Sequence, residues 1–224
     1  MKQEITAYYN DLAKDYDENR FANTYGAYIN KQEHVFLKKY LDQDDVSLNL
    51  DLACGTGRFL DYADYGLDIS DKMIEISMGK YPNKNLQVGD AEKLGYSDSY
   101  FNNILSFHLF MHLDLDMTQN ILNETNRVIK KGGYFIFDMP SKKRRNLTNY
   151  KSASWHGGNQ LDVKTLKKVI GPKWELVTYH GIAFFPIHRI PKKIRSLMIR
   201  LDNLLCRSFF KEYSSYLIFV LKKK

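Results

Sequence analysis

The sequence has few cysteines, no long apolar run and no clustered metal-ligand motif. Cys54 and Cys206 lie far apart without CxxC spacing, so we expect neither a disulfide framework nor a metal site. The longest apolar runs fall far short of the ~20 residues that a membrane span needs. The N-terminus also lacks the apolar core of a signal peptide. These absences predict a protein of the reducing cytoplasm.

Internal repeats and low-complexity linkers are also lacking. The 224 residues are enough for one sizeable core but not for two ordinary domains. We therefore expect a single domain over 1–224, with a helical cap at 1–45, a ligand-binding core at 46–140 and a substrate-side segment at 141–224. The net charge of +7 comes mainly from the last segment. Such basic runs can attract nucleic acid, anionic lipid or acidic small molecules, although most are simply solvated surface.

Strand and helix patterns alternate from residue 46 onward. Apolar strand patterns occupy residues 46–53, 65–69, 85–89, 101–109 and 134–140, and helical patterns occupy residues 58–64, 70–80 and 116–133 between them. This alternation predicts an α/β fold with a Rossmann-like, doubly wound and mostly parallel sheet. Residues 174–185 and 214–223 add two late strands, expected as an antiparallel hairpin at the sheet edge, which makes seven strands. Two helices are expected before residue 46.

A glycine turn follows the first predicted strand, at Gly55 and Gly57. Ligands of open α/β sheets bind beyond the carboxyl ends of the strands, which is where this turn would lie. The dinucleotide fingerprint needs a third glycine, but Leu60 stands in that position and Asp68 follows too soon. No GK[ST] follows the turn, so a P-loop is excluded as well.

Acidic residues stand at three successive strand ends. Asp51 and Asp68 close the first two strands, and Asp90 follows the third. A row of carboxylates would repel a pyrophosphate but would suit a cationic ligand that carries a ribose, a purine and an ammonium group. Asp68 can accept from both ribose hydroxyls, and Asp90 can accept from an adenine amino group.

Five segments in this order resemble the motifs of class I S-adenosylmethionine-dependent methyltransferases. They are LDLACGTGRF, YGLDISDKMIE, VGDAEKL, SDSYFNNILSFHLFMHL and NRVIKKGGYFIFDMP, and the match as a whole runs from about Leu48 to Pro140. The resemblance is greatest to the small-molecule branch that includes quinone and sugar methyltransferases. It implies the cofactor S-adenosylmethionine, released as S-adenosylhomocysteine. It also implies cofactor contacts from Tyr16, Asp51, Ala53, Gly55, Gly57, Asp68, Ile69, Met73, Asp90, Ala91 and Phe107.

Methyl transfer from a sulfonium is an in-line displacement, so the protein mainly orients the acceptor and excludes water. A hydroxyl acceptor must also lose its proton, and histidine is the usual base near neutral pH. His108 follows the fourth strand and is the candidate base, although it could equally form a wall of the pocket. Candidate substrate contacts are Arg20, His112, Trp155, His156 and His188. We expect methylation of an O or N atom of a small anionic or aromatic molecule.

Two other roles are open to this sequence. Methylation of RNA is disfavoured, because no RNA-binding module and no NPPY-type signature follows the fourth strand. The basic amphipathic segment from Pro191 to Arg207 could contact a membrane peripherally, in the manner of an enzyme with a lipid-soluble acceptor such as a quinone. The ordinary role of such a helix, however, is to bury its apolar side against its own sheet. The sequence does not indicate an oligomeric state.

Overall fold

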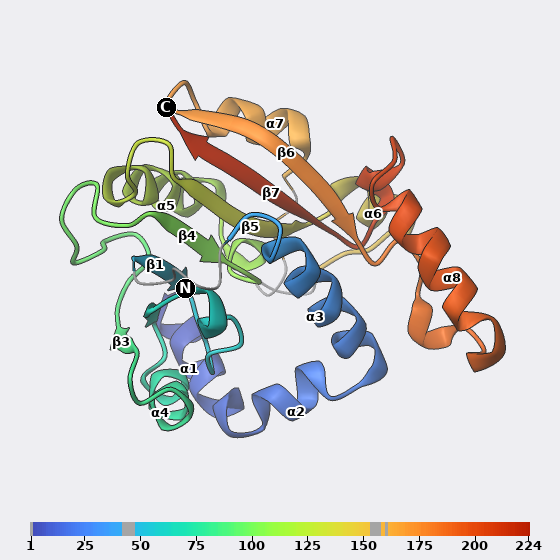
Figure 1. Ribbon diagram of the computed structural model, residues 1–224, viewed down its shortest axis with the longest axis horizontal. Coiled ribbons are helices and arrows are strands. Elements are labelled where there is room, and N and C mark those ends of the chain that lie inside the picture. The colour runs from blue at the N-terminus through green and yellow to red at the C-terminus, as the bar shows by residue number, and fades with distance from the viewer. Residues whose placement is uncertain (1, 42–47, 153–157, 160) are drawn as a thin grey trace.

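One seven-stranded sheet forms the centre of the protein (Figure 1). The computed structural model describes residues 2–41, 48–152, 158–159 and 161–224. The strands run in the order β3-β2-β1-β4-β5-β7-β6. Their bounds are β1 Asn49–Leu52, β2 Tyr65–Asp68, β3 Asn85–Val88, β4 Asn103–Ser106, β5 Tyr134–Pro140, β6 Trp174–Ile182 and β7 Tyr216–Lys223. The expected Rossmann-like fold is confirmed.

The strands β1 to β5 pair in parallel, whereas β7 pairs antiparallel with both β5 and β6. The two late strands therefore form the expected antiparallel pair. Within that pair β7, the last strand of the chain, inserts between β5 and β6 and leaves β6 at the edge. This order puts the apolar YLIFVL run of β7 in the interior, where five successive residues are buried.

Helices cover both faces of the sheet. On one face, α5 (Leu115–Val128) and α7 (Val163–Val169) pack against alternate residues of β5 that include Phe135 and Phe137. On the other face, α3 (Thr24–Leu37) packs against Ile136 and the opposite side of β7. Because successive side chains of a strand point to opposite faces, the unbroken apolar runs of β5 and β7 contribute to both cores.

Local capping fixes the starts of the helices beside the crevice. Ser70 accepts the backbone N–H of Met73 and begins α4 (Asp71–Lys80), as the sequence predicts. The expected helix at 58–64 is shorter, a single 3-10 turn at Leu60–Tyr62. Tyr62 and Leu60 are fully buried there, so packing against the sheet replaces the missing turns.

Three helices and a short 3-10 turn precede the sheet, where the sequence predicts two helices. They are α1 (Lys2–Leu12), α2 (Tyr16–Phe21) and α3, and they follow one another around one end of the molecule (Figure 1). Asn23 ends α2 and begins α3, because its side chain accepts the N–H groups of Tyr25 and Gly26. The chain therefore turns between Phe21 and Thr24, and Tyr16 is brought over the sheet.

A short helix and a long one remain in the described C-terminal part of the chain. They are α6 (Lys142–Leu147), capped by Ser141, and α8 (Lys192–Leu205), which projects from the body of the protein (Figure 1). Against the ordinary expectation, α8 leaves much of its apolar side exposed. Among the described residues, no helix combines the length and the apolar character that crossing a membrane requires.

The packing of β7 between two strands generates a stability prediction. Phe219 is 1% exposed and stacks on Phe137, with ring centroids 5.5 Å apart. Phe219→Ala should lower the free energy of unfolding by about 3–5 kcal/mol, because loss of the ring leaves a cavity in the core beside Phe137. Urea denaturation measures this change. Phe209, which is 83% exposed, is the matched control. Its alanine variant should differ from the parent by no more than about 0.5 kcal/mol, and an equal loss in both variants would contradict the assigned core.

Candidate active site

A crevice of adjoining cavities lies at the carboxyl ends of β1, β2 and β4. Three small cavities of about 70, 50 and 30 Å³ share the backbone at Ala53, and one of about 180 Å³ opens beside them. Tyr16 and His108 line the first and the third of the small cavities. They also line the cavity of about 180 Å³, which is the large cavity of this crevice. The crevice lies where an open α/β sheet is expected to bind its ligand.

The turn after β1 forms the floor of the crevice. Ala53 and Gly55 both have positive φ, 61° and 55°, and both line the small cavities. Gly57 has a φ of 93°, but a Cβ there would lie 2.9 Å from the ring of Tyr81. Gly57 lines none of these cavities, and its positive φ together with the close ring of Tyr81 accounts for a glycine here. Its contact with a ligand stays a prediction.

Asp68 joins the floor to the second strand. Its two carboxylate oxygens accept the backbone N–H groups of Gly55 at 2.8 Å and of Ser70 at 2.9 Å. Burial raises the pKa of Asp68, and these backbone donors partly offset the rise. The carboxylate is therefore held in one orientation, with Ile69 and Met73 beside it in the same cavity. This position is the one the sequence predicts for a ribose ligand.

Asp51 is a buried carboxyl group with an unused acceptor. It is 2% exposed, it lines the smallest cavity with Arg58, and its Oδ2 has no hydrogen-bond partner among the described residues. Burial raises its pKa to about 7, and the positive charge of Arg58 only partly counteracts that effect. A cationic group placed here would supply the missing partner.

Asp90 and Ala91 line the cavity beyond Asp68, together with Ile5 of α1. The Asp90 side chain is 40% exposed and accepts from the Lys2 ammonium at 2.6 Å. Its other oxygen accepts the backbone N–H of Glu92 at 2.9 Å. The structure brings Asp90 to the predicted end of the crevice but already gives both of its oxygens a donor.

A cluster of three titratable side chains lies under the large cavity. The Nε2 of His108 is 3.3 Å from Oε1 of Glu33, and its Nδ1 is 3.4 Å from Oδ2 of Asp138. Both carboxylates are 1% exposed, and neither of these oxygens has a well-formed hydrogen bond among the described residues. The backbone N–H of His108, whose φ is 61°, donates to the other oxygen of Asp138 at 2.5 Å. The ring is thus bracketed by two buried acids.

Arg58 neutralises part of this charge. Its guanidinium donates to Oε2 of Glu33 at 2.5 Å and lies over the rings of Phe21 and Phe59. Burial alone would raise the pKa of Glu33, but Arg58 and His108 together lower it. Burial raises the pKa of Asp138, and His108 only partly offsets that rise. The cluster therefore combines an anionic Glu33 with a carboxyl group that holds a proton more readily than usual.

The donor atoms of Glu33, His108 and Asp138 lie within 4.8 Å of one another, close enough to hold a metal ion. The separation of these residues along the chain does not indicate this cluster. Two features argue against a divalent cation. Each ring nitrogen of His108 already faces a carboxylate oxygen. The guanidinium of Arg58 also places a permanent positive charge beside Glu33, where it would repel a metal cation. A histidine ring held between two carboxyl groups explains the geometry better.

Sequence reasoning missed Glu33, Asp138 and Arg58, although two of them left a signal. Glu33 interrupts the apolar stripe of α3 between Ile29 and Phe36, and Asp138 interrupts the apolar run of β5. A charged residue inside an otherwise buried pattern indicates a paired or functional group. Arg58, on the turn after the glycines, had no comparable signal.

The remaining predicted residues are only partly brought together. His112 lines the crevice and pairs with the hydroxyl of Tyr9, with Nε2 2.7 Å from the oxygen. Arg20 lines the large cavity, and its guanidinium donates to Tyr8 at 3.3 Å. His188 lies outside these cavities against the ring of Tyr25. Trp155 and His156 lie outside the described residues.

Comparison with known proteins agrees with this geometry. A family model described as a methyltransferase domain matches residues 50–137. An uncharacterised protein of Methanocaldococcus jannaschii, MJ1252, is 31% identical, and the alignment covers 99% of this chain and 92% of that protein. The chain belongs to the class I S-adenosylmethionine-dependent methyltransferases.

Solved methyltransferase structures share the fold of the whole chain. A structure from Thermotoga maritima, described as a SAM-dependent methyltransferase and possible histamine N-methyltransferase, has a TM-score of 0.73 at 18% identity and covers 98% of this chain and 99% of its own. The geranyl diphosphate C-methyltransferase of Streptomyces coelicolor, solved with S-adenosylhomocysteine, has a TM-score of 0.66 at 13% identity and covers 100% of this chain and 98% of its own. The narrower likeness to quinone and sugar methyltransferases stays a prediction.

S-adenosylmethionine is the methyl donor of this family, and the crevice fits it. The unpartnered Oδ2 of Asp51 could accept from the ammonium of its methionine part, and Asp68 could accept from the ribose hydroxyls. To do so, Asp68 would have to share or release the N–H groups that it now holds. These residue roles remain predictions that binding measurements can test.

The raised pKa of Asp51 predicts a pH dependence of cofactor binding. Affinity for S-adenosylmethionine should rise as the pH increases up to about 7, because the carboxylate binds an ammonium and the protonated acid does not. Below that pH, binding should release a proton. Calorimetric titration in buffers of different ionisation enthalpy measures both effects. Asp51→Asn should bind more weakly and lose this dependence, whereas the exposed Asp116→Asn should keep it.

The melting temperature of Asp51→Asn distinguishes weaker cofactor binding from misfolding. The folded-state pKa of about 7 exceeds the ordinary value of 3.8, so ionised Asp51 lowers stability increasingly as the pH rises from the lower to the higher value. Asp51→Asn should therefore have a higher Tm than the parent near neutral pH, and the difference should shrink on acidification. A lower Tm, or unchanged cofactor affinity, would contradict the role assigned to Asp51.

Proposed function

We propose that this methyltransferase acts on an O or N atom of a small aromatic molecule bound in the large cavity. The single observation that carries the proposal is the lining of that cavity. Its walls are dominated by aromatic rings and amide groups, and Tyr16 and His108 are shared with the cofactor crevice. The aromatic rings are Tyr9, Tyr16, Phe21, Tyr25 and Tyr216.

Aromatic walls favour a flat acceptor, because rings bury large areas and pack edge to face at little entropic cost. The volume of about 180 Å³ suits one small molecule and not a folded polymer. Arg20 supplies positive charge at this cavity and could pair with an anionic substituent. These features support a small aromatic acceptor over RNA.

Bound S-adenosylmethionine supplies a methyl group already activated by a positively charged sulfur. The chain then has three tasks: to hold the acceptor in line, to exclude water and to remove a proton where the acceptor is a hydroxyl. Tyr16 lies between the two cavities and can contact both molecules. We assign proton removal to His108, with Glu33 and Asp138 as positioning residues.

The contacts of His108 define how it can act as a base. Both ring nitrogens face carboxylate oxygens, so the ring has to give up one of these contacts to accept a proton from the acceptor. Neither contact is a well-formed hydrogen bond, whereas the backbone N–H of His108 is firmly held by Asp138. The ring can therefore turn without loss of its backbone position.

The acceptor class can be tested directly. Purified protein is incubated with S-adenosylmethionine and panels of small phenols, aromatic amines, aliphatic acids, free sugars and transfer RNA, and S-adenosylhomocysteine is quantified. We expect product with members of the phenol or aromatic amine panels and none above background with RNA. Turnover confined to RNA or to aliphatic acids would refute the aromatic acceptor while leaving the methyltransferase assignment in place.

The role of His108 generates a kinetic prediction for a phenolic acceptor. His108→Gln and His108→Ala should each lower kcat by about 100-fold or more, the usual contribution of a general base. The matched control is His180→Gln, because burial lowers the pKa of His180 to about 4 and it lies on β6 away from the crevice. Near-normal rates in both His108 variants would end the idea.

Asp138→Asn tests the positioning role separately. Asp138 faces one ring nitrogen of His108, so its replacement should lower kcat for the phenolic acceptor and leave the KM of that acceptor nearly unchanged. Cofactor affinity should stay unchanged, since Asp138 lines none of the small cavities. A lower Tm together with a higher KM, and no separate fall in kcat, would indicate a structural role only.

A further inference from the structure

Helix α8 exposes a continuous apolar stripe. Ile194, Leu197, Leu201 and Leu204 are 51%, 65%, 41% and 66% exposed. Their spacing of three and four residues places them on one side of the helix. The chain then continues into Phe209 and Phe210, which are also exposed. Scattered exposed apolar residues are normal, but a stripe along a whole helix marks an interaction surface.

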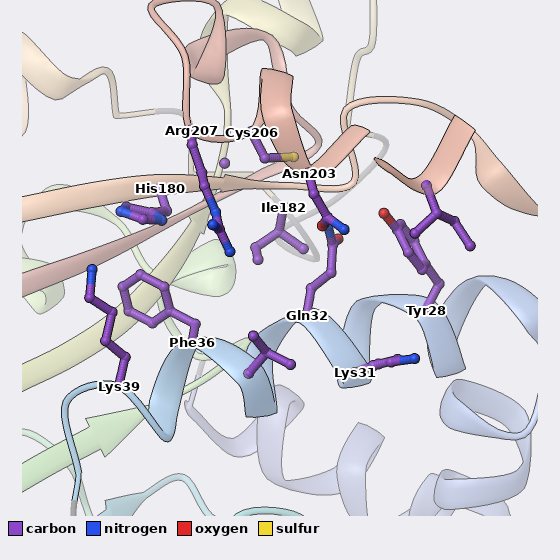
Figure 2. A pocket seen from close by; sticks show the side chains of 13 residues that line it. Tyr28, Lys31, Gln32, Phe36, Lys39, His180, Ile182, Asn203, Cys206 and Arg207 are labelled. Carbon is purple, nitrogen blue, oxygen red and sulfur yellow. The ribbon is translucent and has the colours of Figure 1, made fainter. Parts of the chain in front are cut away.

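A polar anchor explains why this stripe faces outward. Asp202 is fully buried, and its carboxylate accepts from the Tyr28 hydroxyl at 2.7 Å and from the backbone N–H of Phe185 at 2.6 Å. The Gln32 amide of α3 bridges Asp202 and Asn203, at 3.1 and 3.0 Å. Gln32 rises from α3 toward Asn203 of α8, and Tyr28 rises from the same helix (Figure 2). A buried carboxylate without these donors would be costly, so the anchor sets the rotation of the helix.

Basic side chains run along one edge of the stripe. Lys193, Arg200 and Arg207 are seven residues apart, so they lie in a row, and all three are exposed. None of them forms an ion pair within the described part of the chain. The acidic residue of α8, Asp202, is turned inward. The outward side of α8 is therefore apolar and positively charged.

The positive charge continues beyond α8. A cavity of about 450 Å³ lies between α8, α3 and β6, and none of the described residues that line it is acidic. Lys31, Lys39 and Arg207 contribute its charged groups, and Arg207 and Lys39 extend toward the same space (Figure 2). Anionic groups beside α8 would thus meet cations on two helices.

We propose that α8 docks this protein on the surface of an anionic lipid bilayer. An interfacial helix combines an apolar face that enters the acyl boundary with basic residues that meet anionic headgroups. A second copy of the chain fits less well, because it would bring the same unpaired cations against each other. Nucleic acid would leave the apolar stripe in water. This docking does not depend on which molecule is methylated.

Co-sedimentation with vesicles tests the docking. The full chain should bind vesicles of phosphatidylserine and phosphatidylcholine, bind pure phosphatidylcholine much more weakly, and lose affinity as salt is raised. Leu197→Gln with Leu201→Gln should weaken binding by roughly tenfold or more, since it removes the buried apolar area. Lys193→Gln with Arg200→Gln should weaken binding to anionic vesicles by about fivefold for each cation removed.

Matched pairs elsewhere on the surface control for composition and charge. Met78→Gln with Leu115→Gln removes two exposed apolar side chains from α4 and α5, and Lys164→Gln with Lys167→Gln removes two cations from α7. Both control pairs should bind vesicles like the parent. Calorimetric binding of S-adenosylhomocysteine verifies that every variant is folded, because α8 contributes nothing to the small cavities of the crevice.

Three results would overturn the proposal. The first is equal or absent binding to anionic and neutral vesicles, and the second is an equal effect of the control pairs. The third is a dimer in light scattering that Leu197→Gln with Leu201→Gln dissociates, which would assign the stripe to a second copy of the chain. None of these outcomes bears on methyl transfer, so failure of the docking and failure of the proposed function are distinguishable.

Discussion

Buried negative charge at the carboxyl edge of the sheet is the constraint on which the site depends. Asp51, Asp68, Asp138 and Glu33 are all buried within a short span of the crevice. A buried carboxylate without a partner destabilises the folded state, and here a nearby hydrogen-bond donor or positive charge offsets part of that effect for each group. Backbone N–H groups hold Asp68, Arg58 and His108 face Glu33, and the backbone of His108 holds Asp138. Asp51 is the least compensated, because burial raises its pKa to about 7 and its Oδ2 has no hydrogen-bond partner among the described residues.

This charge also explains why the N-terminal helices are part of the site. Glu33 comes from α3, and Tyr16 comes from the short segment before it, so neither belongs to the sheet that carries the cofactor motifs. The salt bridge from Arg58 to Glu33 joins the glycine turn directly to α3. Loss of this salt bridge would affect the wall of the large cavity and the two carboxyl groups that hold the ring of His108. The N-terminal helices therefore cover the crevice and also supply Glu33, which holds the proposed base His108.

Helix α3 links the crevice to α8. Glu33 points toward the crevice, while Tyr28 and Gln32 hold Asp202 of α8. The same helix therefore fixes the acceptor cavity on one side and the outward rotation of α8 on the other. If α8 docks on a bilayer, α3 sets the orientation in which the crevice is presented to that surface. A small-molecule acceptor that partitions into lipid would then be near its enzyme.

Much of the fold could be read from the sequence because its signals are local. The alternation of strand and helix, the helix expected at 70–80, and the acids at the ends of β1 and β2 depend on residues that are neighbours in the chain. The positions of Asp51, Asp68, Ile69 and Met73 in one crevice follow from parallel strands that end at the same edge. The shortened helix after the glycine turn was not foreseen, since burial of Tyr62 compensates for the missing turns.

The sequence by itself determined the family, the sheet and the place of the crevice, because five ordered motifs and their periodicity specify a backbone. Only the tertiary structure decided which side chains meet across long separations. Glu33, His108 and Asp138 come from a cap helix, a strand end and a central strand, and no spacing in the chain shows that they converge. The outward turn of α8 was likewise undecidable. Its amphipathic pattern favours burial of the apolar side, but the hydrogen bonds to Asp202 outweigh it, and their donors lie on distant parts of the chain.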